Sequence, residues 1–149
     1  MQARMEAKPN PDVYSAVQSL AKAIQSSGID PKVTELVHLR ISQINSCSAC
    51  VHAGIAQAKK HGETDERLHA VVAWRESPLF DDAERAALEF AEAATRVQDG
   101  EAGVSDEVWQ RAIEHFGEDQ LSSILLCVAQ TNFFNRINRA LRTPAGQGW

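Results

Sequence analysis

The sequence predicts an all-helical protein that forms a single domain. Along most of the chain, apolar residues recur at the spacing of the buried face of an amphipathic helix. Proline, glycine and capping residues separate these runs, and no alternating apolar pattern between turn residues indicates a β-strand. The 149 residues are enough to bury a core without metals or disulfides. We therefore expect one compact domain over residues 1–149, with about six to seven helices.

Start and stop signals give the expected helices in order. Asn10 before Pro11, and Asp30 before Pro31, are typical of an N-cap followed by proline at the first helical position. By such signals the helices span residues 11–28, 31–46, 47–61, 64–77, 81–97, 105–117 and 118–141. We expect Val97 to lie on a buried helix face.

The last expected helix, over residues 118–141, carries apolar residues on its first half, and Leu125 is among those we expect to be buried. Its second half is polar, and asparagines such as Asn135 and Asn138 are interpreted as a solvated face, with a subunit interface or a pocket wall as the alternatives. The following residues, 143–149, are expected to form a loose tail.

Charge and hydropathy exclude several classes of partner. The formal net charge is −5 and no basic block is present, so we expect no nucleic-acid partner. The first ten residues lack the apolar run of a secretory signal. The longest apolar run, from Ile124 to Ala129, is too short to span a bilayer, so we expect no membrane partner. The sequence therefore predicts a soluble, cytoplasmic protein.

The most informative motif is the pair Cys47 and Cys50, which lies at the start of an expected helix. The first turn of a helix carries unpaired N–H groups and the positive end of the macrodipole, both of which favour a thiolate. A second cysteine one turn further along can reach the first and form a disulfide. In a cytoplasmic protein this arrangement favours thiol–disulfide redox chemistry.

Two other interpretations of the pair stay open at this point. It could form half of a zinc site, although His52 and His61 do not have the spacing of zinc ligands. The two cysteines could also be inert core residues. The third cysteine, Cys127, lies in an apolar run and is expected to be buried and without a redox role.

Residues 35–50, with the sequence ELVHLRISQINSCSAC, resemble the alkylhydroperoxidase D-like branch of the carboxymuconolactone decarboxylase family. The resemblance continues through GET at residues 62–64, AWRESP at 73–78 and ERAAL at 84–88. It covers most of the chain, from about Pro11 to about Arg139, and thins toward the last helix.

The resemblance implies an all-helical fold that assembles into a homotrimer or homohexamer. It also implies reduction of hydroperoxides by a dithiol that cycles to a disulfide. A small dithiol or a protein disulfide reductase would return the electrons, and no cofactor or metal is expected. By position, Cys50 corresponds to the cysteine that attacks the peroxide and Cys47 to the one that resolves it. Glu35, twelve residues before Cys47, corresponds to a glutamate of the proton relay.

The chain departs from the family at the histidine of that relay. Four residues after Cys50, where the family has a histidine, this sequence has Gly54, and Ala49 stands where some members have a second histidine. A histidine follows at His52 instead. On a helix, four residues return to within about 40° of the starting face, whereas two residues lie about 200° away. His52 therefore does not replace the missing side chain.

His38 is the candidate to replace it. It lies three residues after Glu35, on the same face of the expected helix. If the chain reverses near Asn45 and Ser46, residues near 38 come opposite residues near 53, and the imidazole of His38 could fill the space left at Gly54. The alternative is an exposed helical histidine beside a glutamate.

Three functions remain in competition. The first is a thiol-dependent peroxidase. The second is a non-enzymatic oligomeric helical module or a redox sensor, which the altered relay favours. The third is the decarboxylase chemistry of the wider family, which does not require the cysteine pair.

Overall fold

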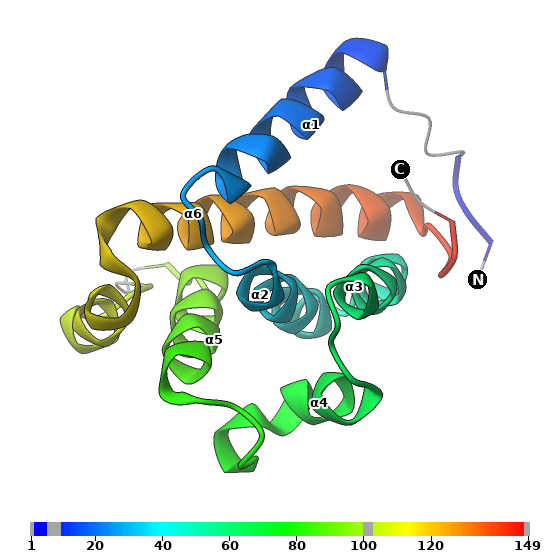
Figure 1. The fold of residues 1–149 in the computed structure, drawn as a ribbon. Helices are drawn as coiled ribbons and strands as arrows, with labels where there is room; N and C mark the ends of the chain where they lie inside the picture. The colour runs from blue at the N-terminus through cyan, green and yellow to red at the C-terminus, as the bar shows by residue number, and fades with distance from the viewer. Residues whose placement is uncertain (1, 6–9, 100–102, 148–149) are drawn as a thin grey trace.

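Helix α2 (Pro31–Ile44) is the central element, and α3, α5 and α6 pack against it (Figure 1). The structure is a computed structural model that describes residues 2–5, 10–99 and 103–147. Besides α2, its elements are α1 (Pro11–Gln25), α3 (Ser48–Lys60), α4 (Asp65–Ala70), the 3₁₀ helix η1 (Val71–Glu76), α5 (Asp82–Thr95) and α6 (Asp106–Leu141). The described residues thus form helices and connecting segments, which confirms the predicted all-α class.

Each α-helix begins at a side chain that accepts a hydrogen bond from a backbone N–H of the first turn. Such caps satisfy donors that have no partner within the helix. The capping residues are Asn10, Asp30, Cys47, Thr64, Asp81 and Ser105. The predicted helix starts therefore agree with the structure.

The core lies on two sides of α2. Val33, Val37 and Ile41 pack into a cluster with residues of α1, α5 and α6. Leu36 and Leu39 belong to a second cluster with residues of α3, α4, η1 and α5. Because α2 is buried on both sides, it is held firmly and can position side chains near its C-terminal end.

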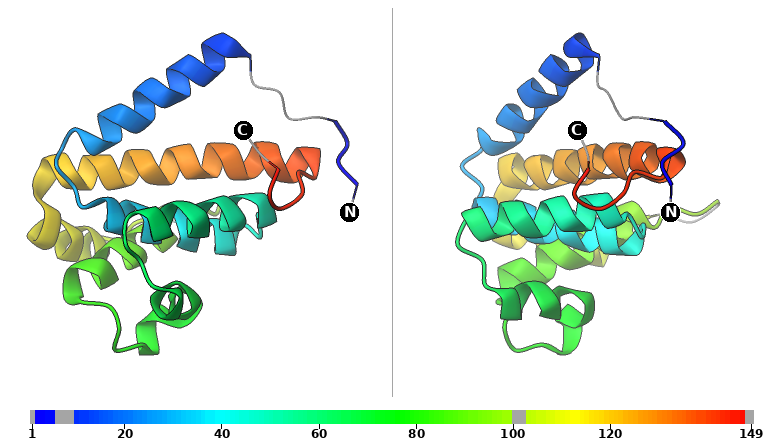
Figure 2. Two further views of the ribbon diagram at one scale, coloured as in Figure 1. Left: turned by 45° about the vertical axis from the view of Figure 1, so that its right-hand side comes forward. Right: turned by 90° about the vertical axis from the view of Figure 1, so that its right-hand side faces the viewer.

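Helix α6 combines two predicted helices. Gly117 has φ +65° and ψ 179°, which interrupts the helix where residues 105–117 were expected to end. The long second half of α6 crosses the molecule, and α1 contacts it at an angle (Figure 2). Ile24, near the end of α1, is buried, whereas Tyr14 near its start is exposed.

Two expected core positions are exposed. Val97 is 71% exposed because α5 ends at Thr95, before the periodic pattern does. Leu125 is 44% exposed because α6 turns a different face to the core, with Ile124 and Val128 buried instead. The apolar spacing of these segments was correct, but the prediction that both side chains are buried was wrong.

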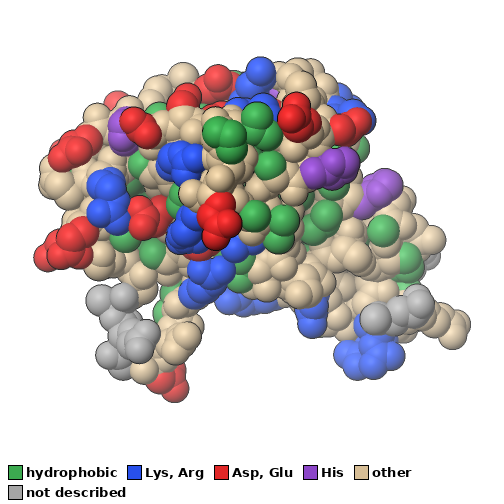
Figure 3. All heavy atoms as spheres, turned by 90° about the horizontal axis from the view of Figure 1, so that it is seen from below, with side chains coloured by type: hydrophobic (Ala, Val, Ile, Leu, Met, Phe, Trp, Pro, Cys, Tyr) green, Lys and Arg blue, Asp and Glu red, His purple; other side chains and the backbone are tan. Residues whose placement is uncertain are grey.

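Acidic and basic side chains are interspersed on the face shown in Figure 3, and hydrophobic side chains lie in small groups between them. Around α4, η1 and α5, several arginines are paired with carboxylates: Arg67 binds Glu84, and Arg75 binds Glu92. No helix in the described part of the chain is both long enough and apolar enough to cross a membrane.

Candidate active site

The turn between α2 and α3 places both cysteines at the start of α3. Ser46 has φ 53°, a left-handed conformation, and the N–H of Cys47 donates to the carbonyl of Ser42 at 2.9 Å. The N–H of Ser46 donates to the carbonyl of Gln43, so the two bonds form the Schellman pattern that ends a helix. The Sγ atom of Cys47 then accepts from the N–H of Cys50 at 3.4 Å. Cys47 therefore takes part in the hydrogen bonds that end α2 and is also the N-cap residue of α3.

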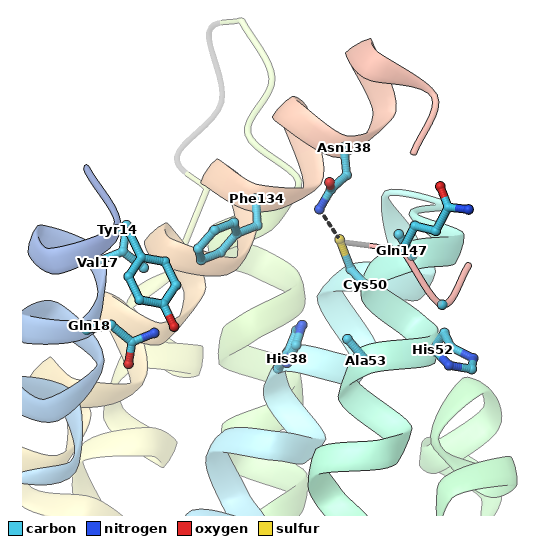
Figure 4. Close-up of a pocket in the computed structure, with 12 residues that line it drawn as sticks. Tyr14, Val17, Gln18, His38, Cys50, His52, Ala53, Phe134, Asn138 and Gln147 are labelled. Atoms are coloured by element: carbon cyan, nitrogen blue, oxygen red, sulfur yellow. Dashed lines mark hydrogen bonds between the residues drawn. The ribbon is translucent and has the colours of Figure 1, made fainter. Parts of the chain in front are cut away.

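Cys47 and Cys50 form a disulfide, with their Cα atoms 5.3 Å apart. Both residues are buried. The Sγ atom of Cys50 also accepts a hydrogen bond from the side-chain amide of Asn138 at 3.4 Å (Figure 4). After reduction, the amide of Asn138 would stabilise a thiolate at Cys50, whereas the first-turn N–H of Cys50 would stabilise one at Cys47.

Asparagines of α6 form hydrogen bonds with residues beside the turn between α2 and α3, here called the cysteine turn. The side chain of Asn45, just before the turn, donates to Asn132 at 3.0 Å and to Asn135 at 2.8 Å. Asn135 in turn donates to the hydroxyl of Ser42 at 3.1 Å. Asn135 and Asn138 are buried, so the interpretation of this part of α6 as a solvated face was wrong. Because the buried amides bond to the turn, they fix its position against α6.

A cavity of about 460 Å³ opens beside Cys50. Tyr14 and Val17 of α1 and Phe134 of α6 supply much of its apolar wall, and the side chains in Figure 4 converge on it. Gln147, in the segment expected to be a loose tail, also lines it. Residues 148–149 of that segment lie outside the described residues. Cys50 thus faces a space that could hold a small organic molecule.

The imidazole of His38 lies against Gly54, the position at which the resemblance implied a histidine. A Cβ atom built on Gly54 would be 3.5 Å from both Cε1 and Nδ1 of His38. His38 lines the same cavity as Cys50, and in Figure 4 its ring points into that cavity from α2. His52 also lines this cavity, but it is exposed on α3 and points away from His38. The structure therefore places His38, and not His52, in the space left at Gly54.

Glu35 lies behind His38 and not beside the disulfide. Its Oε2 atom is 3.7 Å from Nδ1 of His38, and its Oε1 atom is 3.9 Å from Nε2 of His61. Glu35 and His61 line a second cavity of about 540 Å³, whereas His38 lines both cavities. The buried Oε2 atom has no hydrogen-bond partner among the described residues. Glu35 therefore reaches the Cys50 cavity by way of His38.

Comparison with known proteins assigns the chain to a family. Residues 11–93 match the model of the carboxymuconolactone decarboxylase family. The uncharacterized protein YdfG of Bacillus subtilis is 33% identical over 135 residues, which cover 91% of this chain and 90% of YdfG. The chain belongs to the carboxymuconolactone decarboxylase family. The uncharacterized protein YnjA of Escherichia coli is 36% identical over 119 residues, which are 80% of this chain and 64% of YnjA.

Solved structures of similar proteins confirm the fold. ATU0492 of Agrobacterium tumefaciens, a protein of unknown function proposed to be the antioxidant defence protein AhpD, is 30% identical with a TM-score of 0.87. The match covers 97% of this chain and 98% of that one. The debrominase Bmp8 is 24% identical with a TM-score of 0.78, over 91% of this chain and 72% of Bmp8, and shares the fold. The resemblance to the alkylhydroperoxidase D-like branch is therefore supported along almost the whole chain.

The third cysteine of the chain, Cys127, does not belong to the Cys47–Cys50 pair. It is buried in α6, its thiol lies 3.6 Å from the carbonyl oxygen of Thr34, and it forms no disulfide. Burial raises the pKa of the Cys127 thiol to about 12, although a hydrogen bond with Thr131 acts in the opposite direction. Among the described residues, no group of three or more His, Cys, Asp or Glu side chains is arranged to hold a metal ion.

Several residues of the site were not selected from the sequence. Asn138 and Phe134 lie on α6, and Tyr14 lies on α1, far from the cysteines along the chain. One signal was present for the asparagines, because Asn132, Asn135 and Asn138 recur every three residues and so share a helix face. That spacing does not reveal which helix the face meets.

Proposed function

We propose that this protein is a thiol-dependent peroxidase, in which Cys50 attacks a hydroperoxide and Cys47 closes the disulfide. The observation that carries the proposal is the Cys47–Cys50 disulfide at the start of α3, with Cys50 on a cavity that His38 also lines. Membership of the family and the similarity to ATU0492, proposed to be an antioxidant protein, support it.

The reaction has two steps on the protein. The Cys50 thiolate attacks one peroxide oxygen, the O–O bond breaks, and the departing oxygen takes a proton to leave as an alcohol or water. Cys50 is then a sulfenic acid. The Cys47 thiolate attacks the Cys50 sulfur, water leaves, and the disulfide seen in this structure is formed. A dithiol, small or carried by a protein, returns the two electrons.

His38 and Glu35 are the proposed proton relay. His38 would supply the proton to the departing oxygen, because of the two imidazoles that line the Cys50 cavity it is the one beside a carboxylate, that of the half-buried Glu35. Glu35, 3.7 Å from the ring, would hold it in the orientation that proton transfer requires. This relay reaches the cavity from α2, and so it does not need a histidine at the position of Gly54.

A redox sensor would contain the same disulfide, and turnover distinguishes the two functions. A peroxidase consumes many equivalents of peroxide when a dithiol is supplied, whereas a sensor reacts once and recycles slowly. The decarboxylase alternative predicts activity that survives loss of both cysteines.

We also propose that the protein is a homotrimer or homohexamer. Apolar side chains remain exposed on two neighbouring helices, including Val13 and Tyr14 on α1 and Leu125 and Leu126 on α6. Exposed apolar groups of this kind are typical of surfaces that pack against another chain.

The experiment is peroxide consumption with excess dithiol donor, measured for the wild type and for single cysteine variants. We expect Cys50→Ser to fall to the uncatalysed rate, and Cys47→Ser to keep only the slower turnover in which the donor itself reduces the Cys50 sulfenic acid. Cys127→Ala is the matched control, because it also removes a thiol but one that lies outside the pair, and we expect it to retain activity. Equal rates for the wild type and Cys50→Ser would refute a thiol peroxidase.

A further inference from the structure

The two cysteines of the disulfide are buried, and each lines a different cavity. Cys50 lines the cavity shared with His38, whereas Cys47 lines a separate cavity of about 410 Å³. Ser46, Ser48 and residues 143–145 form part of the wall of this second cavity. The peroxidase proposal uses only the first cavity, so the second one has no role yet.

The Cys47 cavity is lined by two arginines and by no acidic residue. Arg139 donates to the carbonyl of Ser46 at 2.9 Å, which holds it beside the cysteine turn. Arg142 follows the end of α6 in a left-handed conformation and is exposed. Its guanidinium makes no hydrogen bond or ion pair with any described residue. Arg136, one turn before Arg139, is bonded to Asn132 and adds a further positive charge at this end of α6.

Arginines near the end of a helix often serve only to satisfy its last carbonyls. Arg4 does so here, because it donates to the carbonyl of Ala140 at 3.1 Å. Arg142 does not, so its charge is directed at the cavity and the solvent. In a chain with a net charge of −5, a cavity with two arginines and no carboxylate is a local site for an anion.

We infer that the Cys47 cavity receives the reductant, and that this reductant is a thiol with an anionic group beside it. The inference rests on the proposed function, since it assigns the second half of the same redox cycle. Attack on Cys47 from this side is favourable because Cys50 is then the leaving group. Its thiolate is the one that accepts the hydrogen bond from the side-chain amide of Asn138.

The exchange balances as two thiols for one disulfide. The reductant thiolate attacks Sγ of Cys47, a new S–S bond forms there, and the bond to Cys50 breaks with its electron pair on Cys50. A second reductant thiolate then attacks the reductant sulfur of this mixed disulfide and displaces the Cys47 thiolate. The reductant is oxidised to a disulfide, and the two protons that it releases balance those taken up as Cys47 and Cys50 become thiols. The peroxide cavity stays free throughout.

The test is the reduction of the oxidised protein by two thiols that differ only in charge, 3-mercaptopropionate and 3-mercaptopropionamide. Rates are divided by the thiolate concentration of each reagent, and then by its per-thiolate rate with a small uncharged disulfide, so that differences in both ionisation and nucleophilicity are removed. The reaction is quenched with an alkylating agent and followed by mass spectrometry. No peroxide is used, so the result does not depend on whether peroxides are the oxidant.

We expect the anionic thiol to react about tenfold faster per thiolate at low salt, and this preference to fall as ionic strength rises. The preference should shrink in Arg142→Gln and disappear in Arg142→Glu. Lys60→Glu is the matched control, because it makes the same change of charge at the opposite end of α3, and it should keep the preference. Arg142 is exposed, and a melting curve shows whether each variant is folded.

Three results would overturn the inference. They are equal thiolate-corrected rates for the two thiols in the wild type, a preference that survives in folded Arg142→Glu, and a mixed disulfide that maps to Cys50. A mixed disulfide on Cys47, together with loss of the preference in Arg142→Glu, would support it. If the protein consumes no peroxide but shows the expected preference for the anionic thiol, it is a dithiol protein whose oxidant is not a peroxide.

Discussion

The imidazole of His38 lies against the backbone of Gly54, with two of its ring atoms 3.5 Å from where a Cβ atom of residue 54 would be. The ring is contributed by α2 and the glycine by α3, so the contact joins the two helices that meet at the cysteine turn. Since His38 also lines the Cys50 cavity, a small residue at position 54 is what allows this imidazole to reach it.

Replacing His38 by alanine should slow peroxide turnover without preventing formation of the disulfide. General acid–base catalysis is typically worth about 10²–10⁴-fold, and the loss should fall within that range. Glu35→Gln should slow turnover by less than His38→Ala does, because the imidazole of His38 is still present in that variant. His69→Ala is the control, since this exposed ring on α4 lines neither the Cys50 cavity nor the Glu35 cavity. An unchanged rate in His38→Ala would remove it from the mechanism.

Gly54→His should lower the melting temperature of the wild type and be tolerated in the His38→Ala background. The new Cβ atom would be in ordinary contact with His38, but a second imidazole beyond it would compete for the same space. In the double variant the ring comes from α3, and we expect turnover to recover above that of His38→Ala. Gly54→Ala is the control for helix propensity alone, which favours alanine by about 1 kcal/mol. Equal melting temperatures for Gly54→His and Gly54→Ala would show that an imidazole at position 54 does not compete with His38 for space.

Stability should depend on pH through Glu92. Burial by itself raises the pKa of this carboxyl, but hydrogen bonds from Trp74, Arg75 and Arg40 outweigh it and lower the pKa to about 2, from an ordinary value of 4.5. Because the pKa is lower in the folded state, the ionised group stabilises the fold above pH 4.5, and that contribution is lost as the pH falls toward 2.

We therefore expect Glu92→Gln to destabilise the protein at neutral pH, by about 1.5–3 kcal/mol for each charged hydrogen bond that it loses. The difference in melting temperature from the wild type should narrow as the pH is lowered from 6 toward 2. Glu89→Gln is the matched control, since Glu89 pairs with Arg111 at the surface. A difference that stays constant with pH would show that the charge of Glu92 is not what stabilises the fold.

Light scattering at micromolar concentration should give the mass of a trimer or a hexamer. Substitution of the exposed Leu125 and Leu126 by serine should shift the mass downward, because these side chains contribute to the apolar surface on α6. Val72→Ser, which changes an exposed apolar residue of η1, is the control. A wild-type mass near 16.4 kDa would refute the proposed assembly.

Capping chemistry allowed the helix starts to be predicted, because a cap such as Asn10 or Asp81 acts within its own turn. The opposition of His38 and Gly54 was also predictable, since a short turn after α2 forces α3 to run back along it. Contacts between distant helices were not predictable in this way. Asn138 and Arg142 come from the end of α6. Periodicity shows which residues share one face of a helix, but it does not show which other helix packs against that face. For the same reason the sequence could not show that Glu35 lines a separate cavity behind His38.

The most direct test of the central claim uses the reduced Cys47→Ser variant and one equivalent of an organic hydroperoxide. Without Cys47 the sulfenic acid has no resolving thiol, so it persists as a gain of about 16 Da and can be trapped with a dimedone-type reagent. The account predicts that peptide mapping finds this label on Cys50, and that the Cys50→Ser variant gains no label under the same conditions. A label on Cys47 in Cys50→Ser, or no label on Cys50 in Cys47→Ser, would contradict it.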